Sequence, residues 1–126
     1  MKKKSFAVNV AICVLALASL ACSLVLPRTA EPLKFNPDSL EKAALDTAYR
    51  AEITITGNET PAGDIYISEG ELPPGLEFEK AADGDRATIS GTPTAAGVYA
   101  FTVYVWCYGT NVSGEVGEKK YTIEVE

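Results

Sequence analysis

Apolar side chains recur at every second position in several segments of this chain. The longest such segment follows Gly97, and its apolar residues are Tyr99, Phe101, Val103 and Val105. A period of two places successive side chains on opposite faces of a strand, so one face is predicted to be buried and the other to meet water. The same alternation marks three further sets of inward residues: Tyr49, Ala51, Ile53 and Ile55; Ile65 and Ile67; and Tyr121, Ile123 and Val125.

Turn-forming residues separate these predicted strands. In the stretch Leu72–Leu76, Pro74 presets φ for the second position of a turn, and Gly75 supplies the positive φ that a type II turn requires next. Pro93 has no N–H to donate to a ladder, so the segment around it is predicted to connect two strands. An Asp-Gly-Asp sequence at residues 83–85 is predicted to close a hairpin. The chain therefore reads as a series of strands and short turns.

Three motifs at this spacing resemble the Putative Ig domain of bacterial surface proteins. They are LPPGL at residues 72–76, ISGTPTAAG at 89–97 and YAFTVYV at 99–105. The resemblance covers most of the chain after the N-terminal segment. It implies an all-β fold, an Ig-like or cadherin-like antiparallel β-sandwich of about seven strands. The family is a repeated spacer and adhesion module, so its fold by itself implies no activity.

The resemblance also bears on the segment near Leu40. Leu40, Ala43 and Ala44 have helical spacing, and propensity alone favours a short helix there. The resemblance instead implies a first strand, so we expect strand or irregular structure. Asp46 stands where the family usually has glycine.

The N-terminal segment is typical of an export signal. Lys2–Lys4 form a basic stretch, and residues 6–26 contain no charged residue. The small residues before Cys22 resemble the end of a lipoprotein signal peptide, in which Cys22 becomes the lipidated first residue. Ser19 and Ala21 also satisfy ordinary signal peptidase, which would release a secreted or periplasmic protein, and the uncharged run is long enough for an uncleaved membrane anchor. In each case the lysines stay inside and the domain is exported.

These features divide the chain into three parts. We expect an apolar signal helix of lipoprotein type at residues 1–21, a proline-containing tether at 22–36, and the Ig-like domain at 37–126. The expected location is the cell membrane or outer envelope, with the protein held by its lipid. Removal of residues 1–21 leaves 8 basic and 17 acidic residues, a net charge of −9. Such a surface disfavours nucleic acid as a partner.

The residues that carry chemistry are few. The chain has no histidine, which removes Ser-His-Asp and Cys-His catalytic pairs. Cys107 has no candidate base and is predicted to be a small core residue, and Glu77 and Glu79 are predicted to lie on the wet face of a strand. The sequence therefore predicts a protein that is not an enzyme.

The sequence predicts no cofactor, and the alternative is a bound calcium ion. Asp83 and Asp85 offer hard oxygen donors, with Gly84 between them. Calcium takes six or more oxygens, and an Asp-Gly turn needs no metal to explain it. The two carboxylates are therefore weak candidate ligands, and no cofactor is expected.

Three aromatic residues depart from the ordinary sandwich pattern. Tyr104, Trp106 and Tyr108 share the parity opposite to Val103 and Val105, so they are predicted to line the outward face of one strand. Adjacent aromatics on a wet face are typical of a contact patch for a glycan or a protein. Loops or a neighbouring sheet edge that cover them, or a bulge that reverses the parity, are the structural alternatives.

The sequence thus predicts a non-enzymatic cell-envelope lipoprotein that presents one Ig-like binding or adhesion module. Two alternatives stay open. One is a structural accessory subunit of an envelope complex, recruited through an exposed sheet edge and without a ligand of its own. The other is a calcium-binding cadherin-like module.

Overall fold

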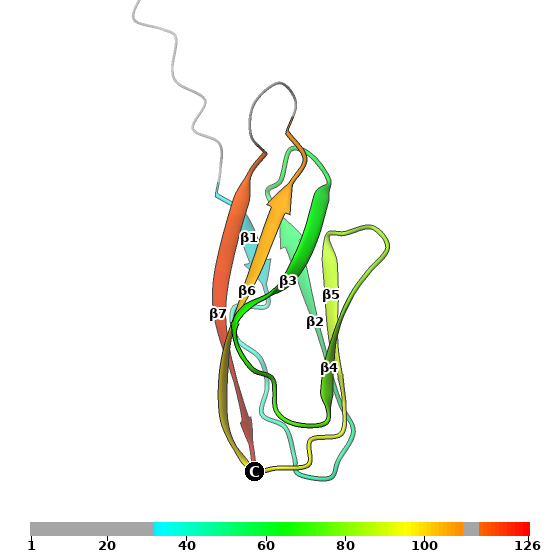
Figure 1. The fold of residues 1–126 in the computed structure, drawn as a ribbon, viewed down its shortest axis with the longest axis vertical. Coiled ribbons are helices and arrows are strands. Elements are labelled where there is room, and N and C mark those ends of the chain that lie inside the picture. Colours follow the sequence, from blue (N-terminus) through cyan, green and yellow to red (C-terminus); the bar gives the residue numbers. More distant parts are fainter. Residues whose placement is uncertain (1–31, 110–113) are drawn as a thin grey trace, which may run out of the picture. The chain divides into compact units, whose positions relative to one another are not determined.

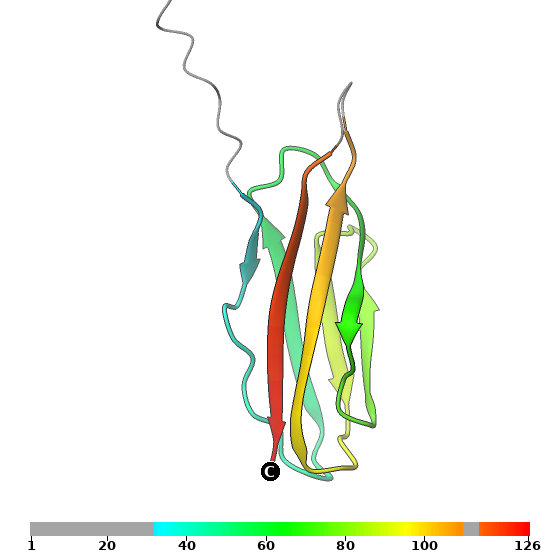
Figure 2. The same cartoon turned by 60° about the vertical axis from the view of Figure 1, so that its left-hand side comes forward.

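The computed structural model describes residues 32–109 and 114–126, and these residues form two antiparallel sheets that lie face to face (Figures 1 and 2). One sheet has the strand order β1-β2-β5-β4 and the other β3-β6-β7. The strands are β1 (Lys34–Asn36), β2 (Tyr49–Thr56), β3 (Ala62–Gly70), β4 (Leu76–Lys80), β5 (Arg86–Gly91), β6 (Gly97–Cys107) and β7 (Val116–Val125). The predicted signal peptide, Cys22 and most of the predicted tether lie outside the described residues.

The core lies between the two sheets, and the predicted parity of β6 is confirmed. Phe101 is 1% exposed, and Val103 and Val105 are fully buried, whereas the residues between them reach the outer surface. The inward residues of the other strands meet them from both sheets. Ile53, Ile65, Ile89 and Ile123 are each at most 2% exposed. Because burial of apolar surface is the main favourable term in folding, this two-sided core holds the sandwich together.

The LPPGL and ISGTP motifs fold against one another. The Leu76 N–H donates to the Pro73 carbonyl oxygen at 3.1 Å, and Gly75 has φ of +93°, so the predicted type II turn is confirmed. The Thr92 N–H donates to the Gly75 oxygen at 3.2 Å, and the Thr94 N–H donates to the Pro74 oxygen at 2.9 Å. A Cβ on Gly75 would lie 2.0 Å from the Thr92 oxygen. Glycine is therefore required here both by φ and by the close approach of the two motifs.

The segment before β2 crosses from one sheet to the other. Lys34–Asn36, at the end of the predicted tether, pair with Thr54–Thr56 as strand β1. The chain then leaves that sheet, and Ala43 forms an isolated parallel bridge with Val125 of β7. The expectation of strand or irregular structure near Leu40 is thus confirmed. Asp46, at the position where the family usually has glycine, has φ of +56°.

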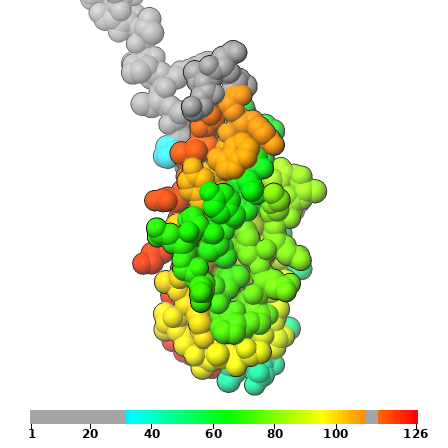
Figure 3. Space-filling view, viewed as in Figure 1, coloured from blue at the N-terminus to red at the C-terminus, as the bar shows by residue number. Residues whose placement is uncertain are grey.

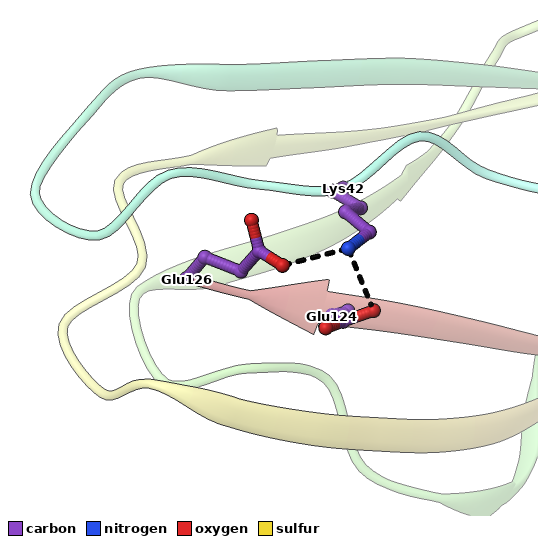
Figure 4. A network of polar contacts seen from close by, with 3 residues as sticks. All are labelled: Lys42, Glu124 and Glu126. Carbon is purple, nitrogen blue, oxygen red and sulfur yellow. Dashed lines mark hydrogen bonds and ion pairs between the residues drawn. The ribbon is translucent and has the colours of Figure 1, made fainter.

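Salt bridges also join this crossing segment to the end of β7 (Figure 4). Lys42 Nζ lies 2.6 Å from Glu126 Oε1 and 3.2 Å from Glu124 Oε2. The neighbouring backbone adds a bond of 2.8 Å from the Ala43 N–H to the Glu124 oxygen. The two carboxylates raise the pKa of Lys42, and the ammonium lowers the pKa of Glu126. These groups are exposed to solvent, so the backbone bridge, rather than the ion pairs, is expected to hold the segment.

Candidate binding surface

The three aromatic residues singled out from the sequence lie at the end of β6 and just beyond it. Tyr104 and Trp106 belong to β6 and point away from the core, and Tyr108 follows the last strand residue. Trp106 is 37% exposed and Tyr108 56% exposed, whereas Tyr104 is half-buried. Figure 3 shows this face, on which orange side chains from the end of β6 lie beside green ones from β3. The structure therefore brings the three residues together on an outer face of the sandwich.

The indole of Trp106 lies against the backbone of the neighbouring strand. The pairing of β3 with β6 has an irregularity between Ala62 and Asp64, and Asp64 is the register partner of Trp106. The residue inside this bulge is Gly63. A Cβ built on Gly63 would lie 2.1 Å from Trp106 Cζ3 and 2.2 Å from Cη2, so the ring covers the place where a side chain would be. One face of the indole is thus packed on Gly63, and its exposed area is left to the opposite face and the ring edges.

A fourth aromatic residue, Tyr66, joins the group from β3. Tyr66 is the register partner of Tyr104, and their ring centroids lie 5.4 Å apart with an interplanar angle of 49°. Trp106 and Tyr108 form a second pair at 5.2 Å and 78°, an edge-to-face arrangement. We call Tyr66, Tyr104, Trp106 and Tyr108 the aromatic surface. Val116 of β7, the other register partner of Trp106, lies at its margin and is 60% exposed.

Tyr66 was missed by the sequence analysis, although a signal for it was present. It lies between the inward residues Ile65 and Ile67, so its parity already indicated an outward position. Its position directly opposite Tyr104 depends on the register of two strands that are far apart in the sequence. That register, with its irregularities between Ala62 and Asp64 and between Ile67 and Glu69, is visible only in the structure.

A pocket of about 400 Å³ lies beside the aromatic surface. Pro61, Gly63 and Tyr108 line one side, and Lys80, Asp83 and Gly84 of the β4–β5 hairpin line the other. The loop before β3 is held in place by Asp85, whose Oδ1 accepts hydrogen bonds from the Ala62 N–H at 3.0 Å and from Asn58 Nδ2 at 3.2 Å. The pocket therefore lies between the β4–β5 hairpin and the aromatic surface, and both contribute to its lining.

Ion pairs border the pocket. Lys80 Nζ lies 2.7 Å from Asp64 Oδ1, and this hydrogen bond is the main cause that lowers the pKa of Asp64. Arg86 Nη2 lies 2.8 Å from Asp83 Oδ2, which raises the pKa of Arg86. Both pairs are partly exposed, so they are expected to contribute little to stability. They place charged and hydrogen-bonding groups next to the aromatic rings.

The weak calcium candidates do not converge on one point. The Asp83 carboxylate pairs with Arg86, and Asp85 accepts bonds from Asn58 and the Ala62 backbone. Within the part of the chain that the structure describes, no group of three His, Cys, Asp or Glu residues is placed to hold a metal ion. Calcium takes six to eight oxygens, so this donor set falls short of what the ion requires.

The structure also places three further residues that the sequence singled out. Cys107 is 3% exposed, and burial is the main cause that raises the pKa of its thiol, with Glu115 and Asp85 adding to the effect. A buried thiol of raised pKa is a poor nucleophile, which agrees with its prediction as a core residue. Glu77 and Glu79 are exposed on β4.

The fold and its paired turn motifs define an Ig-like β-sandwich domain. The family model for the Putative Ig domain matches residues 31–126, and the chain belongs to this family. No curated protein matches the sequence. Among the described residues, none lies in a helix with the length and apolar character needed to span a bilayer.

Two solved structures of similar fold belong to longer chains. The SrpA adhesin from Streptococcus sanguinis matches 80% of this chain with 16% identity and a TM-score of 0.55, and 60% of the adhesin chain is covered. An endo-fucoidan hydrolase of glycoside hydrolase family 107 (MfFcnA9) matches 81% of this chain with 22% identity and a TM-score of 0.54, and 17% of the hydrolase chain is covered. The chain thus spans less than two thirds of either protein, and the similarity concerns the fold.

Proposed function

We propose that this protein is a non-enzymatic lipoprotein of the cell envelope that presents one Ig-like binding or adhesion module. The observation that carries the proposal is the aromatic surface on the outer face of the β3-β6-β7 sheet. Its exposed members are Tyr66 at 42%, Trp106 at 37% and Tyr108 at 56%. The largest contiguous apolar patch on a protein surface is often a site of interaction. The similar fold of an adhesin supports a role at the cell surface.

Tyrosine and tryptophan suit a contact surface for physical reasons. Their rings offer a large apolar area with few rotatable bonds, so little conformational entropy is lost on binding. Here the rings are also held in pairs, and the indole is supported from behind by Gly63. The surface is therefore largely preorganised, which lowers the free-energy cost of binding.

Binding to the envelope tests the proposal. The purified full-length protein and its Trp106→Ala variant would be titrated in detergent with envelope fractions freed of lipid, so that the proposed anchor does not contribute, and the bound fraction measured by sedimentation. We expect the variant to bind at least about tenfold more weakly, since truncation of a buried aromatic contact typically costs over 1.4 kcal/mol. Val98→Ala is the matched control, because Val98 is 70% exposed on the same strand at its other end. Equal binding by all three proteins would contradict the proposal.

Attachment to the membrane is the second part of the proposal. It rests on the lysines, the uncharged segment and the small residues that precede Cys22. Metabolic labelling with palmitate would test it. We expect label in the native protein and none in a Cys22→Ala variant. Label that persists in the variant, or a native protein that is released unlabelled, would contradict lipid attachment at Cys22.

An accessory role through a sheet edge is the second candidate, and one feature favours it. Strand β1 pairs only with Thr54–Thr56, so Tyr49–Ile53 of β2 have no described strand on that side. A groove of about 240 Å³ lies there, lined in part by Leu40, Tyr49 and Arg50. Extended peptides add to edges of this kind.

Envelope pull-down distinguishes the two roles. A double variant, Arg50→Glu with Glu52→Lys, reverses charges beside the groove and leaves the aromatic surface unchanged. In the accessory role this variant would lose its partners and Trp106→Ala would keep them. We expect instead that Trp106→Ala loses its envelope partners and that the double variant keeps them.

The remaining alternative is a calcium-binding module. Titration calorimetry with calcium chloride at millimolar concentration tests it, and a thermal-unfolding measurement with calcium complements it. We expect neither heat of binding nor a thermal shift.

A further inference from the structure

We propose that the aromatic surface binds an uncharged saccharide chain, with one sugar ring stacked on Trp106 and the adjoining one beside Tyr108 at the neighbouring pocket. This inference rests on the proposed function, because it specifies the ligand of the same surface. It is carried by the geometry of the rings, by the size of the surface and by the charges around it.

The rings of Trp106 and Tyr108 stand nearly at right angles, so that one can act as the floor and the other as the side wall of a sugar site. Trp106 is packed by one face on Gly63, so its other face is the flat floor. The ring of Tyr108 stands at 78° to the indole with a centroid distance of 5.2 Å, and it makes the wall. A pyranose with equatorial hydroxyl groups has flat faces of C–H bonds, and such a face can lie on an aromatic ring while the hydroxyls point sideways. A wall at right angles limits where that sugar can lie.

The size of the surface favours a small ligand over a second protein. Tyr66, Trp106 and Tyr108 are 42%, 37% and 56% exposed. With a side chain of this kind offering about 200 Å², they expose roughly 300 Å² together. A stable protein interface needs about 800 Å² from each partner. Two or three sugar rings need far less, and the pocket of about 400 Å³ beside Tyr108 is within the usual range of ligand sites.

The charges near the aromatic surface disfavour acidic sugars. Carboxylates flank both aromatic pairs, because Asp64 is the register partner of Trp106 on β3 and Glu118 is the register partner of Tyr104 on β7. The ammonium of Lys80 is already paired with Asp64. The chain as a whole carries a net charge of −6. An anionic polymer would be repelled, whereas neutral hydroxyl groups can donate to these carboxylates and accept from Lys80.

The bound sugar has a direct optical readout. Trp106 is the only tryptophan of the chain, so the intrinsic emission reports on this surface alone. The full-length protein in detergent would be titrated with cellohexaose, chitohexaose and xylohexaose, and with polygalacturonate and heparin as acidic probes. We expect at least one neutral hexasaccharide to shift the emission saturably to shorter wavelength, and the acidic probes to bind at least tenfold more weakly.

Variants assign the contacts. By calorimetry, the neutral sugar that binds should lose at least tenfold in affinity with Tyr108→Ala and all measurable binding with Trp106→Ala. Val98→Ala, distant on the same strand, should stay within twofold. Thermal unfolding of each variant would establish that it is folded.

The failures of the two proposals are distinguishable. If no neutral sugar binds, yet Trp106→Ala still abolishes binding to envelope fractions, the saccharide inference is overturned and the proposed function stands. If acidic probes bind as tightly as neutral ones, the surface does not select uncharged sugars, and the saccharide inference is overturned. If Trp106→Ala binds envelope fractions as the native protein does, both proposals are overturned.

Discussion

Trp106 occupies the space that a side chain at residue 63 would need. Its Cζ3 atom lies 2.1 Å from the position of a Cβ on Gly63, in a bulge that offsets β3 from β6. A missing side chain on one strand thus allows a large one on the next to lie flat. This contact covers a glycine within a strand and orients the indole ring of the aromatic surface.

Gly63→Ala should displace the indole without unfolding the domain. The atoms that a new Cβ would meet belong to the far end of the Trp106 side chain, which can move, rather than to the backbone. We expect tryptophan emission to shift to longer wavelength and the free energy of unfolding to change by no more than about 1 kcal/mol. Ser68→Ala, an exposed site on the same strand, is the control and should leave the emission unchanged. Unaltered emission in Gly63→Ala would mean that the indole does not rest on Gly63.

Phe101→Ala and Trp106→Ala should differ widely in their effect on stability. Phe101 is 1% exposed and packs between the sheets, so its truncation should cost about 3–5 kcal/mol. Trp106 is 37% exposed on the outer face, and its truncation should cost less than half as much. Denaturant unfolding followed by far-UV circular dichroism would measure both. A larger loss for Trp106→Ala would show that the ring is chiefly structural, against the proposed binding role.

Cys107 should resist alkylation while the domain is folded. Its thiol is 3% exposed, and burial raises its pKa, so little reactive thiolate is present or accessible at pH 8. Treatment with iodoacetamide, followed by peptide mapping, would follow this cysteine separately from Cys13 and Cys22. Labelling should be complete in 6 M guanidinium chloride and negligible without it. Equal labelling rates in both conditions would show that the end of β6 opens readily.

Tyr121 should make the domain less stable in alkali. Burial first, and the charge of Asp38 second, raise its pKa from 10.0 to about 12. The folded state therefore holds the phenolic proton more tightly than the unfolded state, so this stabilisation is complete below pH 10 and is lost as the pH rises through about 12. Tyr121→Phe should flatten the decline in melting temperature between pH 10 and 12. Burial also raises the pKa of Tyr49 and of Cys107, so a smaller decline should remain.

Tyr121→Phe should also lower the stability of the domain at neutral pH. The Tyr121 hydroxyl donates to the Pro37 carbonyl oxygen at 2.8 Å. Its loss should lower the free energy of unfolding by about 1 kcal/mol at pH 7. An alkaline decline that is identical in the native protein and in Tyr121→Phe would assign the effect to other groups.

Much of the fold was readable from the sequence because it depends on local chemistry. The parity of β6 follows from the alternation of Cβ directions along any strand, so Phe101, Val103 and Val105 could be placed inside without knowledge of their partners. The turn at Pro74 and Gly75 follows from the φ values that these two residues favour. The family resemblance added the Ig-like sandwich of about seven strands, whereas the contact between the two turn motifs was visible only in the structure. The leader at residues 1–21 and lipid attachment at Cys22 rest on sequence pattern and stay predictions.

The binding surface needed the tertiary structure. Sequence parity placed Tyr104, Trp106 and Tyr108 on one face, but it could not indicate that Tyr66 lies opposite Tyr104 or that Gly63 lies under the indole. Both contacts depend on the register between strands more than thirty residues apart, and an unpaired residue in a bulge alters that register. Local patterns along a chain thus determined which face each side chain takes, and only the pairing of distant strands decided which side chains meet there.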